Sequence, residues 1–323
     1  MLASVALRKF LDAVPSEYPN HMFCSFADAA RKGIILAFSN GLVRVVAYID
    51  TECPGYADEV FGRIGAIKGT GRAQYEALIQ ILSEIYVTAG VLRVADRHDG
   101  HALFAHEPGR KGEKNPECEV SIAGHWCAIE VKAPALMAHA EKRRSQPWQL
   151  AGRVPQGVFP PTSVKPRDNP VKDFLVSAEA KFAAYEAHRT GALRLLFIIW
   201  DDFCNEPITA LLSPGSGLLT PESFHRGQDG AAVTYPHVDG VIVVRHQHQL
   251  YHSTSEKPLF DGVVDAMEYR HDSFPPKAFI AVPGGRPVPA AVLEALNCVP
   301  LEHCLGGEYI PGEVIMWLGD KDE

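Results

Sequence analysis

The segment that decides the fold is Glu117–Ile122 (ECEVSI), which is followed after three residues by Trp126–Ala133 (WCAIEVKA). Both stretches have the length and the apolar content of β-strands. The connection between them, Ala123-Gly124-His125, is short enough for a tight turn. The sequence therefore predicts an antiparallel hairpin at the centre of the chain.

Charged residues on this hairpin are placed to share one surface. Successive side chains of a strand point to opposite faces, so Glu130 and Lys132 project together, away from the apolar residues beside them. Glu117 and Glu119 share a face of the preceding strand in the same way. The hairpin therefore collects two or three carboxylates and one ammonium group at one end of two paired strands.

The segments around the hairpin predict a mixed sheet flanked by helices. Arg72–Ala89 has apolar residues at helical spacing, and Asn169-Pro170 begins a second helix that continues to Tyr185. Leu193–Trp200 is a continuous apolar run, as in a strand buried on both faces. Val238–Val244 is a further strand. This alternation of helices and strands favours an α/β or α+β fold.

The chain divides into three predicted parts. Residues 1–68 form an N-terminal α/β extension, residues 69–250 form the core, and residues 251–323 form a C-terminal extension packed on it. In the first part, Asn40-Gly41 predicts a hairpin turn between strands at Ile34–Phe38 and Leu42–Ile49. Other expected elements are a strand at Ala102–Ala105, helices at Met137–Arg144 and Pro289–Leu296, and strands at Ala278–Val282 and Val314–Leu318.

Composition is that of a soluble globular protein, with 46% hydrophobic and 22% charged residues. The sequence contains no apolar run long enough to predict a membrane span, so no membrane partner is expected. Its first residues favour a short amphipathic helix over a secretory signal, so we expect a cytoplasmic location. The seven scattered cysteines show no disulfide framework. The net charge of −8 argues against coating of nucleic acid along the whole surface but leaves room for a local basic cleft.

The charged hairpin has the groups that phosphodiester hydrolysis needs. Carboxylates hold a hard cation such as Mg²⁺, which keeps several of its waters. The cation activates a water and neutralises charge on the phosphate, and a nearby lysine orients that water or stabilises the transition state.

In this segment the chain resembles the PD-(D/E)XK, or restriction-endonuclease-like, nuclease superfamily. Its motif is a proline and an acid on one strand, followed on the next strand by an acid, any residue and a lysine. Pro116-Glu117 and Glu130-Val131-Lys132 match that pattern, although the family more often has Asp where Glu117 stands. The resemblance covers Gly71 to Trp200, and it implies a restriction-endonuclease-like mixed sheet.

The resemblance also implies roles for residues outside the hairpin. Family members tend to carry a glutamate on the helix before the first strand; Glu76 matches it, and Glu84 is a weaker candidate. The helix after the motif often supplies Gln or Lys, and Lys181 lies there. The resemblance implies Mg²⁺, with Mn²⁺ as a substitute, held by Glu76, Glu117 and Glu130. Because Glu117 replaces Asp, Glu119 stays open as an alternative ligand.

A basic segment follows the hairpin and predicts a path for a phosphate backbone. Between residues 142 and 172 it carries seven basic residues against one acid, Asp168, and Trp148 in it could stack on a base. A solvated surface loop is the alternative. The candidate nucleic-acid contacts are Arg143, Arg144, Arg153, Lys165, Arg167 and Lys172. Lys142 is the seventh basic residue of the segment.

Several other features have simpler explanations. Asp201 and Asp202 end an apolar strand, where a turn or a helix cap is more common than a metal site. Gly69-Thr70-Gly71-Arg72 lacks the Lys-Ser/Thr of a phosphate loop. The acids and histidines of the loop Asp96–His101 fit turn chemistry. Two histidine or cysteine sets are equally weak as metal sites: His246, His248 and His252, which fit a solvated strand end, and Cys298, His303 and Cys304.

The sequence thus predicts a metal-dependent nuclease in which DNA is favoured over RNA. The family resemblance implies restriction, repair or anti-phage defence without choosing among them. The alternative is a catalytically silent, nuclease-like scaffold or nucleic-acid-binding subunit of a larger complex. A homo-oligomer or a protein partner is left open.

Overall fold

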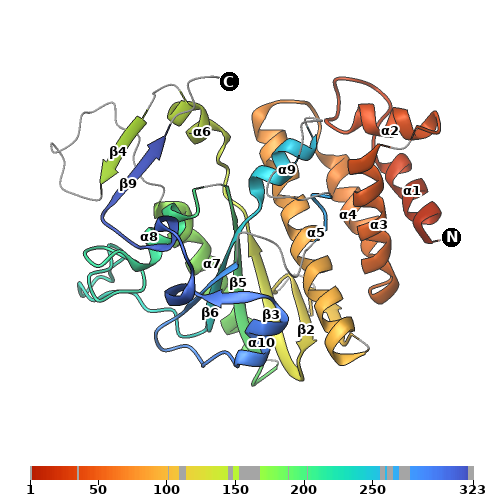
Figure 1. Cartoon of the computed structure of the whole chain (residues 1–323). Helices are drawn as coiled ribbons and strands as arrows, with labels where there is room; N and C mark the ends of the chain where they lie inside the picture. Colours follow the sequence, from red (N-terminus) through yellow and green to blue (C-terminus); the bar gives the residue numbers. More distant parts are fainter. Residues whose placement is uncertain are drawn as a thin grey trace.

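A seven-stranded mixed sheet forms the core of the chain, seen in a computed structural model (Figure 1). The structure describes residues 2–34, 36–100, 102–108, 114–144, 148–152, 168–187, 189–201, 203–254, 259, 265–268 and 277–318. The strands, in their order across the sheet, are β1 (Phe104–His106), β2 (Cys118–Ile122), β3 (His125–Lys132), β5 (Leu193–Trp200), β6 (Gly240–Arg245), β7 (Lys277–Ala281) and β8 (Cys298–Pro300). β3, β5 and β6 run parallel to one another, whereas β2 is antiparallel to both of its neighbours. This confirms the expected mixed sheet flanked by helices.

Helices cover both faces of the sheet. On one face lies α5 (Arg72–Asp99), and α1 to α4 pack beyond it, farther from the sheet (Figure 1). α9 (Gln247–Thr254) and α10 (Ala290–Ala295) join the same apolar core. On the other face α7 (Asp168–Glu186) and α8 (Asn205–Leu212) enclose a second core. The remaining elements are α6 (Met137–Arg144), the 3₁₀ turns η1 (Leu301–His303) and η2 (Gly307–Tyr309), and a two-stranded sheet of β4 (Trp148–Gly152) and β9 (Val314–Leu318).

β5 is buried on both faces, as its continuous apolar sequence predicts. Leu195, Phe197 and Ile199 contribute to the core under α5. The residues between them contribute to the core under α7. The alternation of a strand therefore assigns every side chain of the central strands to one of two faces, which fixes the surroundings of the charged residues on β3.

The predicted hairpin near the N-terminus is wrong. The described residues of 2–68 form helices and contain no strand, so this extension is helical rather than α/β. Apolar residues recur every three to four positions across the supposed turn, from Phe38 through Leu42 to Ile49, and all are buried. Gly41 is needed for close packing, because a Cβ there would lie 2.7 Å from the Asp265 carboxylate oxygens. The helices are α1 (Leu2–Ala13), α2 (Cys24–Arg31), α3 (Ala37–Glu52) and α4 (Tyr56–Ala66).

α5 is the central helix of the first core. Residues Arg72–His98 have the length and apolar composition of a membrane span, but 83% of the most apolar window is buried inside the protein. The helix is ten residues longer than the predicted Arg72–Ala89, so Asp96 and His98 belong to it rather than to a loop. Its apolar surface is used in packing against the sheet and against α3 and α4.

The predicted β2–β3 hairpin forms, with a turn one residue shorter than the expected connection. Ile122 pairs with His125, so only Ala123 and Gly124 lie in the turn, at φ values of 51° and 75°. Positive φ at both central residues is the signature of the turn type that suits the twist of a hairpin. The pairing of Glu119 with Ala128 brings the acidic strand β2 beside the motif on β3.

Candidate active site

The candidate site lies at the end of β3 on the face covered by α7. Ile129 and Val131 of this strand are buried in the α5 core, so Glu130 and Lys132 point to the opposite face. β3 is parallel to β5, and Glu130 is paired in register with Leu196. The motif side chains therefore project between the sheet and the α7 helix.

Two lysines converge on the carboxylate of Glu130. Lys132 Nζ lies 2.8 Å from Glu130 Oε1. Lys181 Nζ, from α7, lies 2.8 Å from the same oxygen and donates a hydrogen bond of 2.9 Å to Oε2. The family resemblance implied that Lys181 reaches this site. The structure brings Glu130, Lys132 and Lys181 together.

The Glu130 site combines a buried anion with cations that reach solvent. The Glu130 side chain is 1% exposed, whereas Lys132 and Lys181 are 17% and 27% exposed. A carboxylate so deeply buried requires charged partners. Both ammonium nitrogens lie 2.8 Å from Oε1, so this buried oxygen is held by two cations, each of which also reaches solvent.

Glu117 lies beside this site at the start of β2. The paired residues of the hairpin end at Cys118 and Ile129, and continuing this register by one residue places Glu117 opposite Glu130. Its Oε1 is 3.4 Å from His106 Nε2. Burial opposes ionisation of Glu117, but the hydrogen bond to His106 and the positive charges of His106, Arg63 and Lys181 lower its pKa. Glu117 is therefore stabilised as an anion by positive charges on both sides of the sheet, His106 and Arg63 on the α5 side and Lys181 on the α7 side.

Glu84 belongs to the α5 side of this charge cluster. Arg63 Nη2, from α4, lies 2.5 Å from Glu84 Oε2. Burial, with a second contribution from the negative charge of Glu117, raises the pKa of Glu84 to about 7. Arg63 and His106 did not emerge from the sequence, because they come from α4 and β1 and no local pattern links them to the motif.

Glu119 is engaged farther along β2. Its carboxylate lies 2.5 Å from Arg189 Nη1, and its side chain is only 4% exposed. The Arg189 guanidinium also lies over the Trp126 ring, 4.4 Å from its centroid. Burial, and then the interaction of its hydroxyl group with the Glu119 carboxylate, raise the pKa of Tyr185. Glu119 thus has its own set of partners.

Glu76 also has a structural partner. Its Oε1 accepts a 3.0 Å hydrogen bond from the backbone N–H of Met137, the first residue of α6. A carboxylate at a helix N-terminus satisfies an amide that otherwise lacks a partner. Among the described residues, no three His, Cys, Asp or Glu side chains are grouped to hold a metal ion. Glu76 and Glu119 are therefore not assembled with Glu117 and Glu130 into one cluster.

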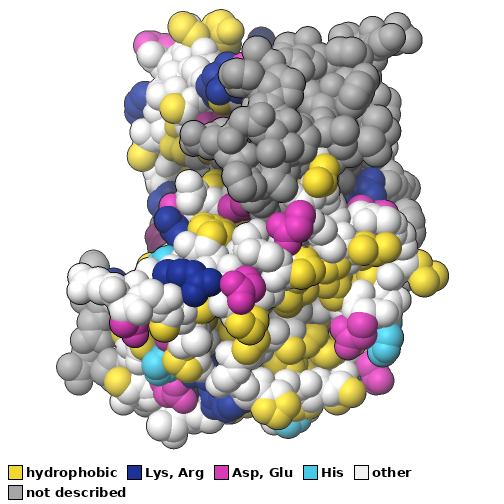
Figure 2. All heavy atoms as spheres, turned by 90° about the vertical axis from the view of Figure 1, so that its left-hand side faces the viewer, with side chains coloured by type: hydrophobic (Ala, Val, Ile, Leu, Met, Phe, Trp, Pro, Cys, Tyr) yellow, Lys and Arg dark blue, Asp and Glu magenta, His cyan; other side chains and the backbone are white. Residues whose placement is uncertain are grey.

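Most of the basic segment falls outside the described residues. Arg153, Lys165 and Arg167 lie there, and of Arg143 and Arg144 only the backbone, in α6, is described. Lys172 Nζ is 3.3 Å from the exposed Asp173. On the side of the molecule seen in Figure 2, basic side chains of the described residues are scattered among acidic and apolar ones. The predicted nucleic-acid path stays a prediction.

The alternative sites have structural explanations. Asp201 Oδ1 accepts a hydrogen bond from the Phe203 N–H, a local turn interaction. Asp202 lies outside the described residues. Asp96 Oδ1 accepts a hydrogen bond from the Ala102 N–H after the end of α5. The thiols of Cys298 and Cys304 both face backbone carbonyl oxygens.

The histidines after β6 are buried, which corrects the expectation of a solvated strand end. His246 and His248 are each 5% exposed. The His246 ring stacks on Tyr86, with centroids 3.9 Å apart, and its Nε2 lies 2.7 Å from the Ala266 carbonyl oxygen. Burial lowers the pKa of His246 to about 3. This histidine is a neutral core residue.

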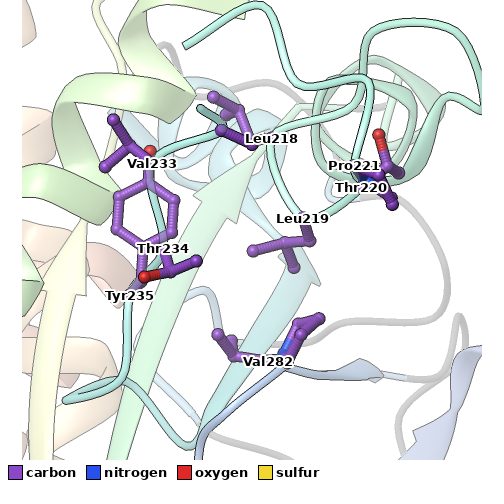
Figure 3. Close-up of a pocket in the computed structure, with 10 residues that line it drawn as sticks. Leu218, Leu219, Thr220, Pro221, Val233, Thr234, Tyr235 and Val282 are labelled. Atoms are coloured by element: carbon purple, nitrogen blue, oxygen red, sulfur yellow. The ribbon is translucent and has the colours of Figure 1, made fainter. Parts of the chain in front are cut away.

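An apolar pocket of about 300 Å³ lies apart from these charges (Figure 3). Leu218, Leu219 and Val282 line it together with Val233 and Tyr235, and none of its lining residues is charged. Apart from the hydroxyl groups of Thr220, Thr234 and Tyr235 the lining side chains are apolar, so none of them offers a charge to a phosphate or a metal ion. The charged groups at the end of β3 are therefore the stronger candidate for chemistry.

Comparison with protein-family models, curated proteins and solved structures finds no match to this chain. The interpretation of the site rests on its geometry.

Proposed function

We propose that the chain is a metal-dependent nuclease of the restriction-endonuclease-like type, with its active site at Glu117, Glu130, Lys132 and Lys181. The observation that carries the proposal is the buried Glu130 carboxylate with two solvent-reaching ammonium groups at 2.8 Å. The order of elements supports it: helix α5, the hairpin with both motif acids, helix α7 with a lysine, and the buried strand β5.

The donor set fits a magnesium ion held by few protein ligands. Mg²⁺ binds one or two carboxylates and completes its shell with waters and substrate phosphate oxygens. The Glu130 carboxylate and the ionised Glu117 across the hairpin would supply those carboxylates. When bound, the cation supplies electrophilic polarisation of the phosphate and a water of lowered pKa.

The lysines change partners during the proposed reaction. If Glu130 held the cation, Lys132 and Lys181 would no longer be needed to neutralise its charge and would be available to a phosphate. Lys181 then contacts the scissile phosphate from the α7 side. Lys132 orients the attacking water or stabilises the charge that develops on the phosphate oxygens. Their partial exposure leaves the path to solvent that such a substrate needs.

The silent-scaffold alternative is favoured by one observation, the structural engagement of Glu76 and Glu119. In that account the lysines only neutralise Glu130, and no substrate reaches them. The two accounts differ in what happens when one lysine is removed, because a neutralising role affects stability whereas a catalytic role affects phosphodiester cleavage.

The test is cleavage of plasmid, linear duplex DNA, single-stranded DNA and RNA with Mg²⁺ or Mn²⁺. Lys132→Ala is expected to lower the rate by roughly 100-fold or more, the usual effect of losing one group that stabilises transition-state charge. Lys9→Ala is the matched control, since Lys9 on α1 is a half-buried lysine, 24% exposed, that is likewise engaged in ion pairs. Cleavage that survives Lys132→Ala would contradict the proposed site, and no cleavage of any substrate would favour the scaffold.

A further inference from the structure

A pocket of about 440 Å³ opens on the α7 side of β1, β2 and β3. Its size is within the range that holds a small organic ligand. It combines apolar and aromatic walls with one acid and one base. The residues that matter here are Leu103, Phe104, Glu119, Trp126, Tyr185 and Arg189.

The Glu119 carboxylate forms the polar floor of this pocket. Its side chain is 4% exposed, whereas its partner Arg189 is 44% exposed. Arg189 follows α7 in the turn that leads to β5, where its N–H bonds to the Tyr185 carbonyl oxygen. A buried carboxylate must keep a donor, but an exposed arginine on a turn can be replaced by another donor at small cost.

The Arg189 guanidinium indicates the shape of the ligand that could replace it. The guanidinium is planar, carries N–H groups side by side, bonds to Glu119 and lies over the Trp126 ring at 4.4 Å. An unpaired guanine base has the same attributes: a planar ring that stacks on an aromatic side chain, and adjacent N1–H and N2–H donors on one edge. We propose that this pocket, the Glu119 pocket, binds an unpaired guanine base.

The other bases fit this floor less well. A carboxylate has only acceptors, so it needs two donors side by side. Adenine presents a donor next to an acceptor on its pairing edge, and uracil or thymine presents one donor between two acceptors. Cytosine offers its amino group beside a ring acceptor. Among these bases, only guanine can donate one hydrogen bond to each carboxylate oxygen without placing an acceptor of its own against the carboxylate.

The position of the pocket links the base to the proposed active site. Glu119 is paired with Ala128, two residues before Glu130 on β3. On the facing helix, Lys181 and Tyr185 are four residues apart and so lie along one side, and the backbone N–H of Arg189, just after the helix, bonds to the Tyr185 carbonyl oxygen. A guanine in the Glu119 pocket would therefore belong to a nucleotide next to the phosphate at Lys181. This step rests on the proposed nuclease function, whereas guanine binding alone does not.

The test is calorimetric titration of the metal-free protein with the 5′-monophosphates of guanosine, adenosine, cytidine and uridine. All four carry the same phosphate, so differences report on the base. Guanosine monophosphate is expected to bind about tenfold more tightly than the others, as a bidentate base contact provides. Equal affinity for the four nucleotides, or no binding of any, would overturn the proposal.

Variants tie the preference to the pocket. Glu119→Gln is expected to lose the guanine preference and to gain adenine binding, because an amide pairs with adenine through a donor and an acceptor. Trp126→Ala should weaken the binding of all four nucleotides about tenfold, because the base loses its stacking partner. Glu186→Gln, on the same helix but outside the pocket, is the control. Unchanged guanine preference in Glu119→Gln would contradict the assignment.

The two proposals can fail separately. Lys132→Ala is expected to abolish cleavage while keeping guanosine monophosphate binding, so a failed nuclease assay leaves the pocket test intact. Oligonucleotides with a single guanine separate a base within a strand from a free nucleotide. If the pocket serves the nuclease, cuts cluster next to that guanine in the wild type and lose this bias in Glu119→Gln. Cuts without bias, with free nucleotide still bound, would assign the pocket to a mononucleotide.

Discussion

Two buried ion networks of the described residues lie at opposite ends of the parallel strands. In the closed network, the side chains of Arg194 and Asp239 are 5% and 0% exposed, whereas in the open network both lysines reach solvent. At the amino ends of β5 and β6, Arg194 donates to both carboxylate oxygens of Asp239, at 2.7 and 3.1 Å, and to Glu186 at 2.5 Å. Asp239 also accepts the backbone N–H groups of Arg194 and Arg286. At the carboxyl end of β3, Glu130 instead faces two lysines whose side chains are 17% and 27% exposed.

On the proposed function, the difference separates a structural network from a catalytic one. In the closed network, removal of Arg194 leaves Asp239 buried and uncompensated. In the open network one carboxylate faces two cations that reach solvent, so the positive charge exceeds what that carboxylate needs and is available to a phosphate. Burial and ion pairing alone therefore do not distinguish the two networks, whereas an excess of cations beside solvent does.

Removing Arg194 should have the largest effect on stability. Arg194→Met leaves Asp239, whose side chain is fully buried, without its main partner. We expect a loss of about 3–5 kcal/mol in the free energy of unfolding, measured by urea denaturation. Arg226→Ala, which removes an exposed pair with Glu222, should change it by less than about 0.5 kcal/mol.

The open network should respond in the opposite way. Lys132→Ala leaves Glu130 paired with Lys181, so its stability loss should be well below that of Arg194→Met, while its cleavage loss is the larger. A Lys132→Ala protein as unstable as Arg194→Met would place the two networks in one structural class.

The titration of His246 should have a smaller effect on the free energy of unfolding. His246 also shows that a buried polar group at the carboxyl end of a strand, here β6, need not belong to a functional site. Its folded pKa of about 3 lies below the unfolded value of 6.5. As the pH falls below 6.5, the unfolded chain takes up a proton that the folded protein does not, so stability is lost. Between pH 7 and pH 5 this amounts to about 2 kcal/mol.

The check on His246 compares the wild type with His246→Phe, which keeps a ring against Tyr86 but cannot titrate. As the pH falls from 7 to 5, the urea midpoint of the wild type should decrease more than that of the variant. A stability difference that is the same at both pH values would show that His246 is not buried in its neutral form.

Local patterns in the sequence predicted much of the fold that positions the site. The apolar run of β5 and the strand Val314–Leu318 have the predicted bounds, and so does Met137–Arg144. The N-terminal error has a local cause, since the Asn-Gly dipeptide suggested a turn where burial follows a helical period. The small sheet could not be foreseen, because β4 and β9 are more than 160 residues apart and pair through contacts that no short window contains.

Only those parts of the candidate site that depend on regular spacing along a strand or on the order of elements were predictable. Glu130, Lys132 and Lys181 meet because a strand alternates and a helix follows it. The partners of Glu119 and Glu76 depend on where distant elements end, at Arg189 and at Met137. His106 and Arg63 reach Glu117 from elements that no motif connects to it.

Mn²⁺ titration of the metal-free protein tests most directly whether the open network is a metal site. We predict one binding site in the wild type, weakened at least about tenfold by Glu130→Gln, the kind of loss expected when a metal-site interaction is removed. Glu186→Gln, which alters the closed network, should bind as the wild type does. Binding that is unchanged in Glu130→Gln would contradict the account, and so would a wild type that binds no divalent cation.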